Sequence, residues 1–383
     1  MQQCNFLPKK VYECSSGTEI TLIIAVGGKV NYMSDKKYDV LSFGEAMVRL
    51  TAPDHERLEQ ANFLNLAISA AELSVAVNIS NLGLRTSWIS KLVDTWSGRY
   101  IIERARGQGV DMSNVITVPF DGVGWTRNGL CFIEIGIGPR ASRMLYDRGY
   151  SAISKIQPGE IEWEKIMSQT SWFHTTGIST ALSENVANEV IVALKIAKKF
   201  RVKTSFDLNF RSTLWNSEKA KEVIKQVMSY IDVLLGNEED FEKCLGITAE
   251  GTTENYSNIN PLGYEAVARK LIQAYPNIEL VGTTLRNAKT ALLNDWQTAM
   301  LYKGKYYLSR KYENLEIMDR IGGGDSFASA LIYCCIVGKE AQEIIDFSAA
   351  YSALCHGFMG DWNWATREEA ENVMKGGSAR IKR

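Results

Sequence analysis

Two spacings of apolar residues alternate along most of the chain. Residues 38–44 form a short, mostly apolar run that ends at a glycine, which is typical of a buried strand. Between residues 72 and 82, apolar side chains recur at helical spacing, and Gly83 follows as a helix stop. A strand over 86–92 and a helix over 97–106 come next. This β-α-β-α order predicts a parallel sheet that is covered by helices.

The same alternation resumes in the second half of the chain. The predicted strands there are 171–174, 203–207, 232–235 and 278–283, and the predicted helices are 183–200, 218–230 and 263–274. A meander over 290–309 leads into a glycine-rich loop, and helices follow. Because no repeat or proline-rich linker marks a second unit, we expect one main α/β domain over 33–383.

The alternation breaks between residues 115 and 148. Short alternating runs separated by glycines predict antiparallel strands with one solvated face. Together with residues 47–66, they predict a small β-sheet lid, inserted in the domain over the mouth of the main sheet. An exposed lid edge favours strand pairing between two copies, so we expect a homodimer or a higher homo-oligomer.

Composition narrows the class of partner and the compartment. The 383 residues are 45% hydrophobic, enough for one large core, and no apolar run approaches the roughly 20 residues that span a bilayer. A formal net charge of -1 gives no basic field for nucleic acid or for a membrane surface. The seven cysteines are odd in number and form no C-x-x-C pair, which favours the reducing cytoplasm. Small solutes are the expected partners.

Residues 1–32 show no clear pattern, and we treat them as an N-terminal extension outside the domain. Their one hydrophobic patch, 21–26, follows Glu19 and precedes Gly27-Gly28-Lys29, which does not match a signal peptide. Met33 is an alternative start just before the first strand. Disorder of the extension and a misassigned start both stay open.

The stretch Gly322-Gly323-Gly324-Asp325 carries the strongest chemical signal. Successive glycines leave peptide N–H groups uncovered, and the apolar periodicity after Asp325 predicts that a helix begins there. Free N–H groups and the helix dipole bind an anion, such as a transferring phosphoryl group. A carboxylate at this place can accept the proton of an attacking alcohol. The alternative, a tight turn with Asp325 as N-cap, explains these four residues equally well.

Ligands of open parallel sheets lie beyond the carboxyl ends of the strands, so polar residues that follow predicted strands are further candidates. The guanidinium of Arg211 can grip a carboxylate with two hydrogen bonds, and an ion pair with Asp207 is the alternative. Asn237 and Asp240 can order Mg²⁺, although such a cluster is more often a solvated helix start. Residues 283–286 are a weaker candidate for contact with nucleotide phosphates.

Tyr146 and Arg148 belong to the predicted lid. If alternate side chains share a face, both point over the mouth of the main sheet. A charged outer face of an edge strand is the alternative. His174 and His356 lack metal-ligand spacing, which predicts packing or polar-network roles.

Asp319 stands six residues before Asp325, so the stretch reads D-x-x-G-G-G-D. It resembles the D-x-x-G-x-G-D signature of the ribokinase-like, or PfkB-type, carbohydrate kinases, and the resemblance covers most of the chain from Tyr38 onward. It becomes sharper, to the 2-keto-3-deoxygluconate kinases, at residues 71–77, 145–148, 207–215, 237–240 and 319–325. The resemblance implies a three-layer α/β/α fold with a mostly parallel central sheet and a small β-sheet lid.

The resemblance also implies an activity, the ATP-dependent phosphorylation of a primary hydroxyl of a small sugar acid. Asp325 would then be the base, and Gly322, Gly323 and Gly324 would form the anion hole. Arg211 would meet the substrate carboxylate, with Tyr146 and Arg148 helping to hold the sugar acid.

The implied cofactors are ATP and Mg²⁺, with a monovalent cation as a further candidate. Asn237 and Asp240 would support the Mg²⁺-nucleotide, and Asp319 is a second candidate metal ligand beside Asp240. The adenine would lie near Thr284, Arg286 and His356.

Three departures from the pattern of these kinases affect the expected sugar site. The usual Gly-Gly is Ser69-Ala70, the usual Asn is Ser74, and a lid tyrosine is Cys131. We expect Ser74 and Cys131 to lie at the substrate and to shift the acceptor or weaken binding. A kinase for a neutral sugar such as ribose or fructose, and a catalytically idle sugar-binding relative, therefore stay open.

Overall fold

The computed structural model describes residues 10–12, 23–26, 29–32, 35–248 and 261–377. Its central strands are β4 (Tyr38–Phe43), β7 (Thr86–Ile89), β12 (Thr170–Thr176), β13 (Lys203–Asp207), β14 (Val233–Leu235), β15 (Leu280–Ala288), β16 (Leu293–Tyr302), β17 (Lys305–Leu308) and β18 (Tyr312–Glu316). Within the described residues these nine form one sheet in the order β17-β16-β15-β14-β13-β12-β4-β7, with β18 also paired to β16. The strands from β7 to β15 run parallel, and β16 runs antiparallel to its neighbours.

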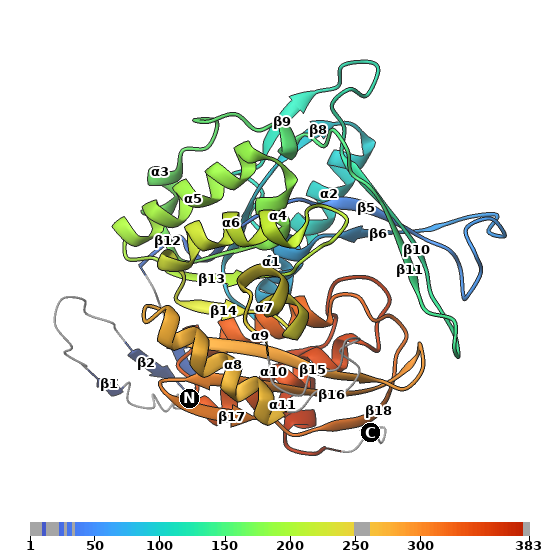
Figure 1. The fold of residues 1–383 in the computed structure, drawn as a ribbon. Helices are drawn as coiled ribbons and strands as arrows, with labels where there is room; N and C mark the ends of the chain where they lie inside the picture. The colour runs from blue at the N-terminus through green and yellow to red at the C-terminus, as the bar shows by residue number, and fades with distance from the viewer. Residues whose placement is uncertain (1–9, 13–22, 27–28, 33–34, 249–260, 378–383) are drawn as a thin grey trace, which may run out of the picture.

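Helices cover both faces of this sheet (Figure 1). One face is covered by α1 (Ala71–Asn81), α9 (Gly323–Ile336), α10 (Ala341–Cys355) and α11 (Arg367–Met374). The other is covered by α3 (Trp163–Met167), α5 (Glu184–Lys199), α6 (Ser217–Val227), α7 (Glu238–Leu245) and α8 (Pro261–Ala274). Because successive side chains of a strand point to opposite faces, Leu41 and Phe43 of β4 enter one core and Val40 enters the other. The predicted three-layer α/β/α fold is confirmed.

Four further helical elements connect these layers. They are α2 (Trp96–Gly107), α4 (Gly177–Leu182) and two 3-10 helices, Ile153–Lys155 and Met228–Tyr230. Among the described helices, none combines the length and the apolar character that a bilayer-spanning segment needs.

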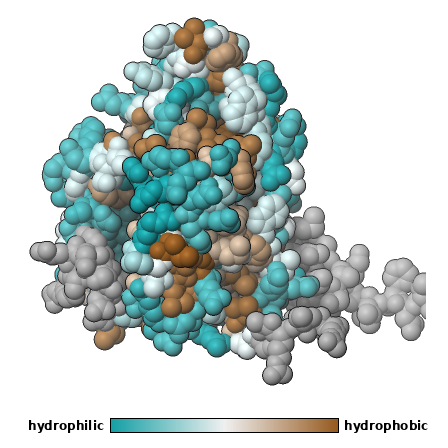
Figure 2. Space-filling model, turned by 90° about the vertical axis from the view of Figure 1, so that its right-hand side faces the viewer, coloured by the Kyte–Doolittle hydropathy of each residue, from teal (hydrophilic) through white to brown (hydrophobic). Residues whose placement is uncertain are grey.

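A second sheet projects from the body as the lid (Figure 1). It consists of β5 (Met47–Thr51), β6 (Asn65–Ser69), β10 (Gly129–Glu134) and β11 (Arg143–Asp147), in the order β11-β10-β5-β6. Its outer face exposes apolar side chains such as Leu66 and Leu145. Figure 2 shows apolar patches among polar residues on the side from which the lid projects.

Two details of the predicted lid are wrong. The strand β9 (Ile116–Pro119) lies outside the lid, because it pairs in parallel with β8 (Lys91–Asp94) in a small separate sheet. In addition, β10 runs parallel to β5, with Gly129 opposite Met47, whereas antiparallel pairing was expected. The alternating pattern shows that one face of a strand is solvated, but it carries no information on the partner or its direction.

The N-terminal extension is described only in part. The strands β1 (Lys10–Tyr12), β2 (Ile23–Val26) and β3 (Lys29–Tyr32) pair with one another in an antiparallel sheet. The rest of residues 1–34, including the alternative start Met33, lies outside the described residues.

Candidate active site

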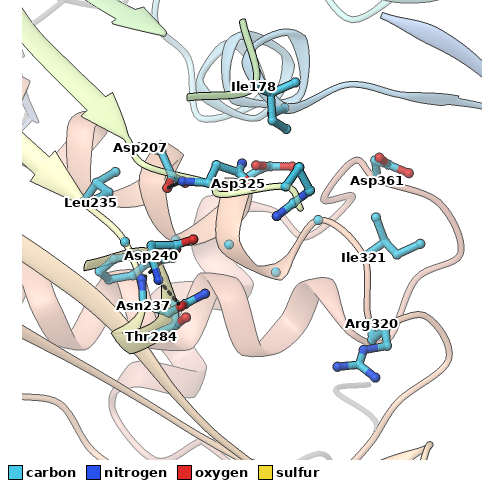
Figure 3. Close-up of a pocket in the computed structure, with 18 of the residues that line it drawn as sticks. Ile178, Asp207, Leu235, Asn237, Asp240, Thr284, Arg320, Ile321, Asp325 and Asp361 are labelled. Carbon is cyan, nitrogen blue, oxygen red and sulfur yellow. Dashed lines mark hydrogen bonds between the residues drawn. The ribbon is translucent and has the colours of Figure 1, made fainter. Parts of the chain in front are cut away.

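A cavity of about 600 Å³ lies where the carboxyl ends of the central strands, the lid and the start of α9 meet. Of the predicted site residues, it is lined by Tyr146, Arg148, Arg211, Asn237, Asp240, Thr284, Arg286, Gly322, Gly323, Gly324 and Asp325. Figure 3 shows Asp325 at its centre, with Asp207 and Asp240 on one side and Asp361 and Ile321 on the other. The fold thus collects residues that are far apart in the sequence.

The glycine loop has the backbone geometry of an anion site. Gly322 is the N-cap of α9 with φ of 84°, and a Cβ there would lie 2.3 Å from the carbonyl oxygen of Asp361. A Cβ on Gly323 would lie 2.8 Å from the His356 ring, whereas Gly324 has open space around it. The first N–H groups of a helix have no intrahelical acceptor, so they are available to a ligand.

Asp325 lies in the first turn of α9, half-buried in the cavity. Burial raises the pKa of its carboxyl well above the usual range, and the charges of Asp207 and Asp361 raise it further. The nearby charge of Arg211 opposes this rise in the pKa. A carboxylate with a raised pKa is a better proton acceptor, so Asp325 has the properties of a general base.

We call the part of the cavity next to the lid the lid half; it contains Glu45, Ser69, Glu72, Tyr146, Arg148 and Arg211. Here Arg148 forms an ion pair of 2.7 Å with the buried Glu45 and lies over the ring of Tyr146, 5.0 Å from its centroid. One oxygen of the buried Glu72 accepts hydrogen bonds from the hydroxyls of Thr176 and Ser179, at 2.7 and 2.6 Å. Most charged groups of the lid half therefore have protein partners.

Arg211 is different from its neighbours in the lid half. Its guanidinium donates to the carbonyl oxygen of Phe210 at 2.9 Å, but it forms no ion pair within 4 Å with any described residue. The alternative ion pair with Asp207 is therefore not formed, although Arg211 lies near enough to oppose the burial that raises the pKa of Asp207 to about 7. A guanidinium without an ion-pair partner can bind a carboxylate ligand by donating hydrogen bonds to it.

The opposite part of the cavity, which we call the β15 half, contains Asn237, Glu238, Thr284, Arg286 and Arg320. Asn237 and Asp240 form a capping box at the start of α7, with hydrogen bonds of 2.9 and 3.0 Å. The second oxygen of Asp240 accepts from the Phe210 N–H at 2.8 Å. Both oxygens of Asp240 are thus held by backbone groups, which supports the helix-start alternative for this residue.

Asp319, the other candidate metal ligand, has its oxygens occupied in a similar way. Its two oxygens accept hydrogen bonds from the N–H groups of Ile321 and Gly360, each at 3.1 Å, and it forms a buried ion pair with Arg49. In the described part of the chain no group of three or more His, Cys, Asp or Glu residues could hold a metal ion. The residues present therefore fit a Mg²⁺ ion held mainly by nucleotide phosphates and water. The monovalent cation stays a prediction.

Three other predicted residues do not line the cavity. Ser74 is fully buried in α1, where its hydroxyl donates to the carbonyl oxygen of Ala70. Cys131 is buried on the inner face of β10, where it packs with Met47. His356 is buried behind Gly323 and packs edge-on against Trp296, 4.5 Å between ring centroids.

The sequence prediction missed two arginines. Arg49 of β5 is fully buried, and it pairs with Asp319 and, at 2.8 Å, with Asp361. These partners are 270 and 312 residues away in the chain, so no local signal could have identified the pair. Arg320 belongs to the D-x-x-G-G-G-D stretch and stands two residues before Gly322. A cationic residue so close to a predicted anion loop was a usable signal.

Comparison with known proteins agrees with this geometry. Residues 37–361 match the pfkB family of carbohydrate kinases. The chain is 30% identical to the 2-dehydro-3-deoxygalactonokinase of Haloferax volcanii over 90% of its own length and 99% of that protein. A crystal structure of 2-dehydro-3-deoxygluconokinase from Thermotoga maritima superposes with a TM-score of 0.83 and 36% identity, covering 88% of this chain and 100% of that one.

A more distant structure agrees in fold alone. It is a ribokinase II from E. coli in complex with ATP and Mg²⁺, with a TM-score of 0.71, 19% identity, and coverage of 88% of this chain and 99% of that one. The fold is therefore ribokinase-like, and the chain belongs to the pfkB family of carbohydrate kinases.

Proposed function

We propose that this kinase transfers the γ-phosphoryl group of ATP to the primary hydroxyl of a small sugar acid, with 2-keto-3-deoxygluconate as the substrate. The observation that carries the sugar-acid assignment is Arg211, which lines the cavity without an acidic partner among the described residues. The names of the relatives from Haloferax volcanii and Thermotoga maritima support the same class of acceptor.

Asp325 accepts the proton of the hydroxyl as its oxygen bonds to the γ-phosphorus. The bond from that phosphorus to the β–γ bridging oxygen breaks, and ADP leaves with the electron pair. The N–H groups of Gly323 and Gly324 stabilise the charge on the transferring group. Bound Mg²⁺ would neutralise phosphate charge.

The substrate acid is held in the lid half. Its carboxylate meets the fork of Arg211, and Tyr146 with Arg148 covers the sugar from the lid. The nucleotide extends into the β15 half, past Asn237, Thr284 and Arg286. Exclusion of water by the lid protects the phosphoryl group from hydrolysis.

The setting of the reaction is part of the proposal. The five cysteines in the described residues are free, in keeping with a reducing cytoplasm. The exposed apolar side chains of the lid, Phe63, Leu66 and Leu145 among them, suit a homodimer formed through the lids.

A coupled assay of ADP release tests the function. We expect turnover with 2-keto-3-deoxygluconate or its C4 epimer, 2-keto-3-deoxygalactonate, and little with ribose or fructose. ADP release with none of the sugars would identify an idle relative, and a preference for a neutral sugar would identify the other alternative.

Arg211→Leu tests the carboxylate assignment within the same assay. Loss of a charge-assisted contact should lower kcat/KM for the sugar acid about ten- to a hundredfold. The KM for ATP serves as the internal control and should stay the same. An unaltered kcat/KM for the sugar acid would refute the assignment.

A further inference from the structure

Two arginines of the β15 half lack an ion-pair or side-chain hydrogen-bond partner among the residues that the structure describes. Arg286 on β15 and Arg320 before the glycine loop both line the cavity and are half-buried. Neither forms a side-chain hydrogen bond or an ion pair within 4 Å with any described residue. This contrasts with Arg148 and Arg49 of the lid side, which pair with one and two carboxylates.

The nearest carboxylates cannot neutralise these two arginines. Asp319 precedes Arg320 in the chain, but Arg49 and two backbone N–H groups already occupy its oxygens. Glu238 lies near Arg286 without forming an ion pair, and burial raises the pKa of Glu238 to about 7. A carboxyl group with this pKa is only partly charged at neutral pH, so it is a weak counter-ion.

The two guanidinium groups also repel each other. Burial is the main cause that lowers the pKa of Arg286 to about 10, and the charge of Arg320 contributes to this shift. The charges of Arg286 and Arg320 also contribute to the low pKa, about 4, of His356, which is lowered mainly by burial. Like charges gathered in a half-buried cavity are unfavourable until an anion enters between them.

We propose that Arg286 and Arg320 form a two-arginine clamp for the phosphates that remain on the departing nucleotide. Arg320 is two residues from Gly322, so a γ-phosphoryl group at the glycine loop leaves the α- and β-phosphates to the arginines. In Figure 3 Arg320 lies on the far side of the glycine loop from Asp207, and Thr284 lies across the cavity from Arg320. Planar guanidinium forks match phosphate oxygens with paired hydrogen bonds.

The clamp acts on the same reaction as the proposed function and rests on it for the direction of transfer. As the bond between the γ-phosphorus and the bridging oxygen breaks, the electron pair and the new negative charge move onto the β-phosphate. Two cations that bind the β-phosphate would stabilise this charge on the leaving ADP. This assigns Arg286 and Arg320 to the donor, and it separates them from Arg211, which serves the acceptor.

The test compares wild-type full-length protein with Arg320→Gln, Arg286→Gln and a control, Arg106→Gln. Arg106 is exposed at the end of α2, outside the cavity. Binding of ATP, ADP, AMP and inorganic tripolyphosphate is measured by calorimetry, and Tm is measured with and without each ligand.

We expect each cavity variant to bind ATP and tripolyphosphate about ten- to a hundredfold more weakly, because each loses a charge-assisted contact. AMP binding should change least. Without ligand, the Tm of each variant should be equal to or higher than that of the wild type, because a repulsion has been removed. The sugar-acid KM and the control should not change.

A structural role for the arginines would give the opposite pattern. The proposal is overturned if both variants have a lower Tm without ligand but keep the wild-type affinity for ATP and tripolyphosphate. The test is also separable from the proposed function. If the wild type turns over no sugar acid, yet its affinity for tripolyphosphate depends on both arginines, the function fails and the clamp stands.

Discussion

The two halves of the cavity differ in how their charged side chains are paired within the protein. In the lid half, Arg148 pairs with Glu45, and one oxygen of Glu72 is held by two hydroxyls. In the β15 half, Arg286 and Arg320 have no such partners among the described residues. Except at Arg211, the lid half is therefore assembled before any ligand arrives, whereas both arginines of the β15 half are neutralised only by an anionic ligand.

This difference suits two ligands with different demands. A sugar acid must be oriented so that one hydroxyl faces the base, which requires fixed side chains. A nucleotide carries several negative charges, and these charges can neutralise the arginines when the nucleotide binds. The protein therefore gains nothing from pairing the arginines internally, because a ligand would have to break those pairs before binding.

Asp325→Asn should have the largest effect on the chemistry, because Asp325 lies where the two halves meet. The amide keeps the size of the side chain but cannot accept the hydroxyl proton. We expect kcat to fall by about 10²- to 10⁴-fold with little change in Tm, measured by ADP release and thermal unfolding. Affinity for ATP should persist. A kcat close to that of the wild type would mean that another group is the base.

Arg49→Met should have the largest effect on stability. It leaves Asp319 and Asp361 buried side by side without a cation, and removing one member of such a network costs about 3–5 kcal/mol. The free energy of unfolding can be measured in urea by tryptophan fluorescence. The control is Arg99→Met, whose ion pair with Asp94 is more than half exposed and should be worth less than about 1 kcal/mol. Equal losses in the two variants would contradict this assignment.

The sequence predicted that the glycine loop precedes a helix and that Asp325 lies beside it, since this signal is local to four residues, and the roles of these residues stay predictions. Apolar periodicity likewise predicted strands such as β13, because a buried strand has its own signature. Arg49 could not be found in this way, since its role arises only when the lid meets residues 319 and 361. Ser74 was misjudged because an alignment of motifs gives the position of a residue but not the face of α1 on which it lies.

Glu238→Gln tests the electrostatic state of the β15 half. In the folded protein the pKa of Glu238 is raised from 4.5 to about 7, so folding favours its protonated form. The contribution of Glu238 to the stability of the wild type should therefore be highest at low pH and fall as the pH rises from about 4.5 to 7. The variant should lack about 2 kcal/mol of this fall, measured by urea unfolding at several pH values. The control is Glu239→Gln, which changes the exposed neighbouring carboxylate. The prediction is refuted if the unfolding free energy changes equally with pH in all three proteins.

Ser69→Ala should have the smallest effect, and it tests whether the lid half is as firmly assembled as its contacts suggest. Ser69 stands where related kinases usually have glycine, and its hydroxyl donates to Asp361 at 3.0 Å. Asp361 keeps its ion pair with Arg49, so the variant should lose only about 1 kcal/mol in urea unfolding. Because Asp361 abuts Gly322, a small displacement should lower kcat a few-fold and leave the KM for ATP unchanged. A higher kcat or a lower sugar-acid KM would show instead that the serine obstructs the acceptor, as its bulk suggested from the sequence.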